Sequence, residues 1–428
     1  MNPSRRAFLA STTAAAVVAP HVFAEEEKKH PKPLRFGVIG VGSRGTSLLR
    51  QLLRLEGIEI PVICDINEDH YGRAARVVEK ERGNTPEGFC KGDYDYRRML
   101  ARDDFDAVLI ATPMSWHAEM AVDSMNAGKH VASEVPGADR LEDCWALVDT
   151  KEKTGKKYML LENVHYMDLY LAIYNMVHQG ILGKCYYAEC SYIHDCNSLK
   201  FNSRGELTWR GEMTRDFYGN RYPTHSLGPV AKWMDVNRGD LMVSLTSATS
   251  EALAPHAYAV RKFGAESEQA KIAFKGGGHC VTLIKTAQDR LITVYYDISS
   301  CRPLSNFYLI QGTEGVFDSR QGIYVDGKSP SHQWEPVTAY LERHRHQLWK
   351  AEGDRAATAG HGGGDFLQLF EFVRAIHEDR EPQVDVYDSA AWSSIIPLSK
   401  ASIDAGASSV EVPDFTRGKW KTRAPGEA

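Results

Sequence analysis

The chain has 428 residues, enough for about two domains with a complete hydrophobic core, and its composition is that of an ordinary globular protein. Its formal net charge of −5 argues against a general nucleic-acid-binding protein. It contains no run of about 18 apolar residues, so we expect no transmembrane span and no stable membrane insertion.

The N-terminus has the features of an export signal. Arg5 and Arg6 precede a mildly apolar segment, and Val22-Phe23-Ala24 places small residues where a signal peptidase could cleave. We therefore expect residues 1–24 to be a twin-arginine signal peptide that directs the protein to the periplasm or the extracellular space. The alternative is a disordered basic tail. The charged, proline-containing residues 25–33 would form a linker.

Residues 34–65 predict the start of a dinucleotide-binding unit. An apolar strand runs into Gly40-Val41-Gly42-Ser43-Arg44-Gly45, which fits G-x-G-x-x-G, and an apolar helix and a second strand follow. Gly40 permits the tight turn, Gly42 lets a pyrophosphate approach, and Gly45 lets the helix pack on the strand. Asp65 ends the second strand, where a carboxylate binds the ribose hydroxyls of NAD and disfavours the 2′-phosphate of NADP. The alternative is a glycine-rich turn in another α/β unit.

Strands and helices continue to alternate through residue 162, which predicts a Rossmann domain over residues 34–162. The segment Met114-Ser115-Trp116-His117 follows a buried strand, at the edge of the sheet where nucleotide contacts are made. Trp116 and His117 would line the nicotinamide site, with core packing as the alternative. The expected elements are helices at 67–82, 117–126 and 141–154, a short helix within 93–100, and strands at 106–113, 130–133 and 158–161.

The pattern changes after about residue 183, where alternating strands replace the strand–helix units. We expect a second, α+β domain over residues 163–412 with a large, mostly antiparallel open sheet, followed by a tail at 413–428. Its strands are expected at 185–192, 241–247, 280–285, 291–297, 307–311 and 409–412, with a polar and aromatic insertion at 197–238 and a helix at 366–378.

The eight cysteines show no C-x-x-C and no convincing metal-ligand spacing, so we predict no metal site. Export would permit disulfides, but Cys185, Cys190 and Cys196 fall on strand-like sequence, where burial is the favoured interpretation. His344 and His346 lie on a polar stretch and are expected at the surface.

The chain resembles the Gfo/Idh/MocA family of nicotinamide-dependent sugar oxidoreductases. The resemblance is carried by GVIGVGSRG, IATPMSWH and AGKHVASEVP, and it covers roughly residues 34–412. Most members have Glu-Lys-Pro where this chain has Glu134-Val135-Pro136. The family's lysine assists ordinary alcohol oxidation, so Val135 argues against a plain dehydrogenase.

A closer resemblance is to glycoside hydrolase family 109, whose known members are NAD-dependent α-N-acetylgalactosaminidases. SRG, MSWH, SEVP, ENVHY, RYPTHSLGPVAKWM and HGGGDF carry it, and YPTH-x-LGPVA is the most specific piece. The resemblance implies a glycan or small glycoside as substrate. It implies NAD contacts at Ser43, Arg44, Asp65, Met114, Ser115, Trp116, His117, Glu134, Val135 and Asn163, and sugar contacts at Tyr192, Arg210, Tyr222 and His225.

Members of this family cleave glycosides without the usual pair of carboxylates. Bound NAD oxidises the sugar at C3, a base removes the acidified C2 proton, the leaving group departs from C1, water adds, and C3 is reduced again. We expect His225 to be the base, with Tyr222 three residues earlier facing the same cleft if the segment opens a helix. Tyr192 and Tyr166 are weaker candidates for proton transfer. Asp365 is either a helix cap or part of the site.

One departure leaves the identity of the sugar open. The family places a substrate-contacting tyrosine in an R-P-Y-S segment, which here reads Arg302-Pro303-Leu304-Ser305. Leu304 cannot donate a hydrogen bond, and Tyr308 lies near it in the sequence.

Two other functions compete with the glycosidase: an oxidoreductase that releases NADH, and a non-catalytic sugar- or nucleotide-binding protein. Val135 and the YPTH segment favour the glycosidase over the first. The intact glycine fingerprint together with His225 disfavours the second. Relatives commonly self-associate through the open sheet face, so we expect a homodimer or a larger assembly.

Overall fold

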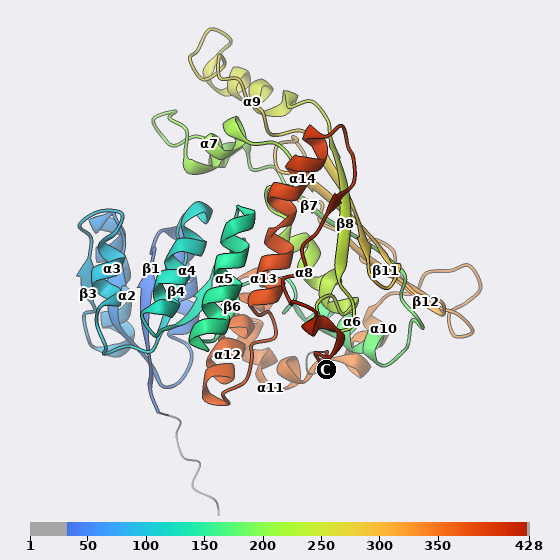
Figure 1. Ribbon diagram of the computed structural model, residues 1–428, viewed down its shortest axis with the longest axis horizontal. Helices are drawn as coiled ribbons and strands as arrows, with labels where there is room; N and C mark the ends of the chain where they lie inside the picture. Colours follow the sequence, from blue (N-terminus) through green and yellow to red (C-terminus); the bar gives the residue numbers. More distant parts are fainter. Residues whose placement is uncertain (1–31, 426–428) are drawn as a thin grey trace, which may run out of the picture. The chain divides into compact units, whose positions relative to one another are not determined.

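The computed structural model describes residues 32–425, drawn in colour in Figure 1. The expected twin-arginine signal peptide, residues 1–24, and nearly all of the expected linker lie outside the described residues. No helix among the described residues is long and apolar enough to cross a membrane.

The first half of the chain forms a parallel sheet of six strands in the order β3-β2-β1-β4-β5-β6. The order reverses between β1 and β4, and such a switch point is where a doubly wound sheet binds its ligand. Every residue of β4 is buried, because helices cover both faces of a parallel sheet. The strands are β1 (Leu34–Ile39), β2 (Ile58–Cys64), β3 (Glu87–Phe89), β4 (Ala107–Ile110), β5 (His130–Ser133) and β6 (Tyr158–Leu160).

The helices of this half begin where their capping residues predict. The Asn67 side chain accepts hydrogen bonds from the amides of Asp69 and His70 and starts α2, and Gly83 ends that helix with φ +77°. The predicted helices at 67–82 and 141–154 are confirmed. The helices are α1 (Ser43–Leu52), α2 (Glu68–Arg82), α3 (Asp95–Leu100), the 3-10 turn η1 (Met114–Trp116), α4 (His117–Asn126) and α5 (Leu141–Thr154).

The second half forms an eight-stranded sheet in the order β13-β12-β11-β7-β10-β9-β8-β14. β7 and β10 pair in parallel, and every other neighbouring pair is antiparallel, which confirms the predicted fold class. The strands are β7 (Tyr187–Ile193), β8 (Met242–Thr249), β9 (Cys280–Thr286), β10 (Leu291–Asp297), β11 (Tyr308–Gln311), β12 (Gly315–Asp318), β13 (Gly322–Val325) and β14 (Val410–Glu411).

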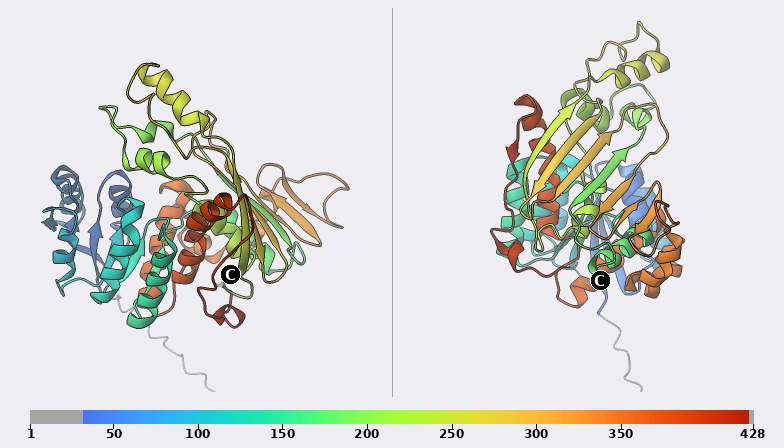
Figure 2. Two further views of the ribbon diagram at one scale, coloured as in Figure 1. Left: turned by 45° about the horizontal axis from the view of Figure 1, so that its top comes forward. Right: turned by 90° about the vertical axis from the view of Figure 1, so that its right-hand side faces the viewer.

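Helices cover one face of this sheet. α8 packs on β7 and β11, and α14 packs on β8, whereas the right-hand view of Figure 2 shows the opposite face bare. Late helices also return to the first sheet, since α12 contacts α1 and β5 and α13 contacts α5 and β6. The helices are α6 (Asp168–His178), α7 (Trp209–Asp216), α8 (Thr224–Trp233), α9 (Leu253–Phe263), α10 (Thr338–His344), α11 (Gln347–Ala356), α12 (Gly364–His377), α13 (Val386–Ser393) and α14 (Ile395–Asp404), with 3-10 turns η2 (Asn197–Lys200), η3 (His361–Gly363) and η4 (Lys419–Lys421).

Two features differ from the expectation for exposed segments. The prediction that His346 lies at the surface is wrong: its side chain is buried, and its Nδ1 accepts a hydrogen bond from the Leu348 amide at the start of α11. The C-terminal segment is packed rather than extended, because the buried Phe415 ring lies 4.7 Å from the ring of Trp145.

Candidate active site

The glycine-rich turn between β1 and α1 is shaped for a dinucleotide. Gly40 has φ +82°, which an L side chain rarely adopts, and a Cβ at Gly45 would lie 1.9 Å from the Gly40 carbonyl oxygen. A Cβ at Gly42 would meet only the His70 ring, at 3.8 Å, so this face of the turn is open to a phosphate. α1 has no side-chain cap, and Ser43 begins it exposed, so its first N–H groups can accept an anion.

Asp65 is oriented at the end of β2 for ribose hydroxyls. One carboxylate oxygen accepts the Val41 amide at 2.8 Å, and the other accepts the Asn67 amide at 2.8 Å. The carboxylate thereby links the glycine turn to the loop after β2, and each oxygen keeps a lone pair for a further donor. Together with the open Gly42 face, this donor and acceptor set fits NAD.

Arg44 is held by two carboxylates rather than left free for a phosphate. Its Nε donates to Glu134 at 2.7 Å, and its Nη1 and Nη2 donate to the two oxygens of Asp365 at 2.7 and 2.8 Å. Asn163 donates to the same Asp365 carboxylate at 2.8 Å. The predicted contacts Arg44, Glu134 and Asn163 are therefore brought together, and Asp365 joins them from α12.

Asp365 does not cap its helix, so that interpretation of Asp365 is wrong. α12 has no side-chain cap, and the Asp365 side chain is fully buried against Arg44 and His361. Burial would raise the pKa of this carboxyl, but hydrogen bonds from His361 and Arg44 outweigh it and hold the pKa well below its usual value. The carboxylate stays charged and fixes the end of Arg44 that points away from Glu134.

The turn after β4 places its four residues in different surroundings. Met114 is buried, Trp116 is half-buried with its ring edge-on to Tyr94 at 5.4 Å, and Ser115 is exposed toward a pocket. His117 is buried, and both of its ring nitrogens lie against backbone carbonyls, of Pro136 at 2.7 Å and Thr112 at 2.9 Å. His117 therefore ties two loops together and has no ring nitrogen left for a cofactor.

His225 is paired with a buried carboxylate. The segment does open a helix, since α8 begins at Thr224, and this aims the His225 Nδ1 at Glu162 Oε1, 2.7 Å away. Glu162 follows β6, is fully buried, and also accepts the amides of Val164 and His165 at 3.0 and 2.9 Å. A carboxylate fixed in this way keeps the proton of a neutral imidazole on Nδ1 and leaves Nε2 as an acceptor.

Two tyrosines complete the group around His225. The Tyr192, Tyr222 and His225 rings lie within 5.2–5.6 Å of one another by centroid. Burial raises the pKa of both tyrosines, and the nearby Glu134 raises it further, while Arg210 opposes the shift. The sugar contacts implied by the family resemblance thus converge near the Arg44–Glu134 pair, with both phenols neutral at physiological pH.

Neither Leu304 nor Tyr308 supplies the family's missing tyrosine. Leu304 is 62% exposed and lies outside this group. Tyr308 is buried and donates its hydroxyl to the His225 carbonyl at 2.7 Å, which fixes the start of α8. Tyr166, a weaker candidate for proton transfer, is fully buried, and its hydroxyl has no partner among the described residues. Val135 is buried as well, so the position of the family's lysine is apolar.

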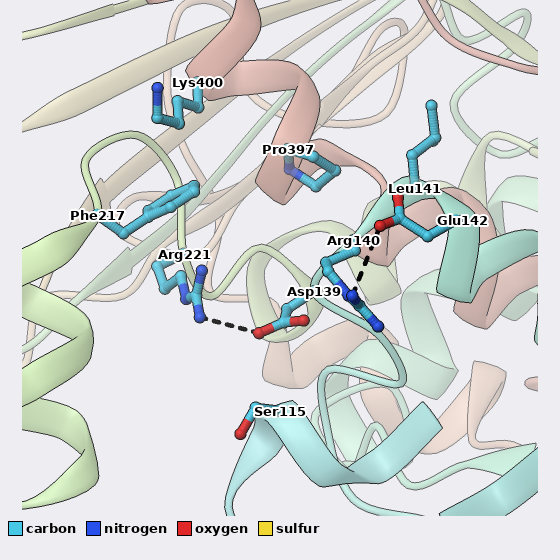
Figure 3. A pocket seen from close by; sticks show the side chains of 9 residues that line it. All are labelled: Ser115, Asp139, Arg140, Leu141, Glu142, Phe217, Arg221, Pro397 and Lys400. Atoms are coloured by element: carbon cyan, nitrogen blue, oxygen red, sulfur yellow. Dashed lines mark hydrogen bonds and ion pairs between the residues drawn. The ribbon is translucent and has the colours of Figure 1, made fainter. Parts of the chain in front are cut away.

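A pocket of about 540 Å³ opens beside this site (Figure 3). Ser115 of the cofactor turn forms one wall, and Arg221, which precedes Tyr222, forms another. Figure 3 shows the Arg221 side chain directed at Asp139, with the Phe217 ring beside it.

Sequence reasoning missed Glu162 and His361 as members of the site. Glu162 carried a usable signal, because a carboxylate directly after a buried parallel strand lies at the binding edge of the sheet. His361, which lies 2.8 Å from Asp365, carried only its place in HGGGDF.

Comparison with known proteins agrees with this site. The family model for the C-terminal domain of glycosyl hydrolase 109 matches residues 166–422, and the model for the NAD-binding Rossmann fold of the oxidoreductase family matches residues 34–162. The first half of the chain is therefore an NAD-binding Rossmann domain.

Among curated relatives, the glycosyl hydrolase family 109 protein 2 of Shewanella sp. (strain ANA-3) is 41% identical over 398 residues, which cover 92% of this chain and 87% of the relative. The α-N-acetylgalactosaminidase of Shewanella oneidensis is 40% identical over 399 residues, with the same shares covered.

Among solved structures, an oxidoreductase domain protein from Kribbella flavida has a TM-score of 0.69 at 18% identity and covers 89% of this chain and 100% of its own. Levoglucosan dehydrogenase in complex with NADH and L-sorbose has a TM-score of 0.67 at 21% identity and covers 90% of this chain and 100% of its own. These structures show the shared fold. The identity and coverage of the curated relatives, together with the C-terminal family match, show that the chain belongs to glycoside hydrolase family 109.

Proposed function

We propose that this glycoside hydrolase cleaves α-N-acetylgalactosaminides, with NAD bound throughout and regenerated in each turnover. The name of the Shewanella oneidensis relative supports the choice of sugar. The observation that carries the chemistry is the Glu162–His225 pair, which lies with two neutral tyrosines beside the cofactor edge of the Rossmann sheet.

NAD would be held by the glycine turn, the first amides of α1 and the Asp65 carboxylate. When bound, it supplies a two-electron acceptor and donor for C3 of the sugar. Arg44 and Glu134 would border its nicotinamide end, because both lie near Tyr222. Arg44 keeps Glu134 charged and in place, so the border is fixed by the ion pair before any ligand arrives.

His225 has the geometry of a general base. Its Nε2 is the free ring nitrogen, and a proton taken there turns the ring into an imidazolium that the Glu162 carboxylate stabilises at 2.7 Å. The acid that it must supply later is the same imidazolium. One residue can therefore remove the C2 proton, which is acidic while C3 is a ketone, and give a proton back after water has added at C1.

Tyr192, Tyr222 and Arg210 would bind the sugar rather than act as bases. Burial raises the pKa of both phenols, so each is a hydrogen-bond donor at working pH. Arg210 contributes a positive charge to the same group, which favours the enolate oxygen that forms as the C2 proton leaves.

An assay with an aryl α-N-acetylgalactosaminide separates the rival functions. Release of the aryl alcohol without net NADH accumulation is the result that we expect. Stoichiometric NADH formation would instead identify an oxidoreductase. Sugar binding with neither signal would identify a binding protein. A panel of aryl glycosides in the same assay tests the sugar, and a stronger preference for another sugar would overturn the N-acetylgalactosamine assignment.

We also propose export by the twin-arginine route, supported by Arg5, Arg6 and the small residues before Glu25. The double variant Arg5→Lys, Arg6→Lys should stay in the cytoplasm. Export of that variant at the normal level would contradict the proposal.

A homo-oligomer formed through the bare face of the eight-stranded sheet is a further part of this proposal. On that face the register aligns Leu283 of β9 with Thr293 of β10, and Leu291 of β10 with Tyr187 of β7. Leu283 and Leu291 are 43% and 37% exposed, although they are apolar residues near the middle of a sheet. Light scattering should give at least twice the monomer mass, and Leu283→Lys with Leu291→Lys should lower it. A monomer mass for the unaltered protein would refute this assembly.

A further inference from the structure

The pocket of Figure 3 lies where four segments meet. The turn after β4 contributes Ser115, the loop between β5 and α5 contributes Asp139 to Glu142, and the end of α7 contributes Phe217 and Arg221. Pro397 and Lys400 of α14 close the remaining side. Because Ser115 belongs to the cofactor turn and Arg221 directly precedes Tyr222, the pocket is continuous with the proposed sugar site.

An aromatic ring and an ion pair form the inner wall of this pocket. The Phe217 ring lies 4.5 Å from the Arg221 guanidinium, and Arg221 donates to Asp139 at 2.9 Å. The Arg221 Nε is buried and has no partner among the described residues. The wall therefore offers a flat apolar surface next to groups that can donate to and accept from hydroxyls.

The charges around the pocket are paired with one another. Arg140 donates to Asp143 at 2.8 and 2.9 Å, and Lys400 donates to Asp404 at 2.5 Å. With Arg221 held by Asp139, each of the three cations of the lining has a carboxylate partner. An ionic ligand would have to break one of these pairs, and an aliphatic ligand would strip water from them. A neutral, hydroxyl-rich ligand needs neither.

From this we propose that the pocket is the subsite for the leaving group, and that it takes a second, neutral sugar. The inference rests on the proposed glycosidase function, because it needs a bond at C1 that is broken beside the cofactor turn. The second ring would stack on Phe217, and its hydroxyls would bind Arg221, Asp139 and Ser115. A pocket of about 540 Å³ lies within the usual range for small-ligand sites.

Binding to the NAD-loaded protein tests the subsite apart from turnover. We would use the His225→Ala background to prevent cleavage and compare two ligands by calorimetry. One is methyl α-N-acetylgalactosaminide, and the other is the disaccharide in which the same sugar is α-linked to galactose. The disaccharide should bind about tenfold more tightly, the equivalent of about 1.4 kcal/mol. In the active protein, kcat/KM should show a preference in the same direction.

Variants of Phe217 locate this preference. Phe217→Leu keeps apolar volume under Arg221 and should abolish most of the tenfold difference, while affinity for the methyl glycoside changes less than threefold. Phe217→Tyr keeps the ring and should retain the preference. Trp334→Leu is the matched control, since Trp334 is a 42% exposed aromatic that does not line the pocket.

Several results would overturn the subsite. Equal affinities for the two ligands would do so, as would an equal weakening of both by Phe217→Leu or the absence of any disaccharide binding. Tighter binding of a serine-linked glycopeptide than of the disaccharide would overturn the choice of a sugar. If neither ligand is cleaved by the active protein while the preference and its loss in Phe217→Leu remain, the glycosidase proposal fails and the subsite stands.

Discussion

Replacing Glu162 with glutamine should separate the positioning of His225 from its stabilisation. The glutamine keeps the size of the side chain, so its oxygen can still accept the His225 Nδ1 proton now held at 2.7 Å. It carries no charge, however, when His225 becomes an imidazolium. A hydrogen bond to a charged partner is worth about 1–2 kcal/mol more than a neutral one. We therefore expect kcat to fall by about 5- to 30-fold.

The same substitution has a predictable cost in stability. Glu162 accepts the His165 amide through its second oxygen at 2.9 Å, and glutamine would turn an NH₂ group toward that amide. Leaving these buried donors unpaired should lower the free energy of unfolding by about 1–3 kcal/mol. Thermal unfolding measures this loss, and cofactor titration should show an NAD affinity within about twofold of normal, because the Asp65 site is untouched.

The matched control is Asp235→Asn, which neutralises a carboxylate bound to His178 at 2.9 Å outside the site. It should destabilise the protein without lowering kcat on the aryl glycoside. The reasoning is refuted if Glu162→Gln keeps kcat within twofold of normal in a folded protein. It is also refuted if the loss appears only in KM, since that result would mean a purely structural role.

His225→Ala should lower turnover by about 10² to 10⁴, the usual contribution of a general base, and stopped assays with NAD binding measured alongside should show the affinity unchanged. Asp65→Ala removes the acceptor of the Val41 and Asn67 amides, so NAD should bind more weakly while the preference over NADP shrinks; tighter NADP than NAD binding in the unaltered protein would contradict this role. Acid should destabilise the protein partly through Asp365. Its folded pKa is depressed, so its contribution is complete above the unfolded value of about 3.9 and is lost as pH falls below it. Urea titrations from pH 5 to 3 should show a shallower loss in Asp365→Asn, and an unchanged slope would exclude this residue as the cause.

Segments with a complete local signal could be predicted closely from the sequence. The predicted helix at 141–154 and the predicted strand at 291–297 match α5 and β10 at both ends. Apolar residues at helical spacing and Gly155 at φ +66° define α5, and alternation defines β10. The glycine turn and Asp65 were predictable because their chemistry is encoded within 32 consecutive residues.

The parts that were missed depend on contacts between distant residues. α13 is buried at every position, because it lies between β6 and α8, so it has no polar face and shows no helical periodicity. The Arg44–Asp365 pair joins residues 321 positions apart, and Glu162 meets His225 across 63 positions. The family resemblance supplied His225, but only the folded chain shows which carboxylate orients it.

Turnover in deuterium oxide tests the central claim most directly. If His225 removes and returns the C2 proton, the released sugar must carry deuterium at C2, with no net accumulation of NADH and with slower incorporation in Glu162→Gln. Mass spectrometry and proton NMR of the product measure both the amount and the position of the label. Normal hydrolysis with hydrogen retained at C2 would exclude the elimination route and, with it, the role assigned to the Glu162–His225 pair.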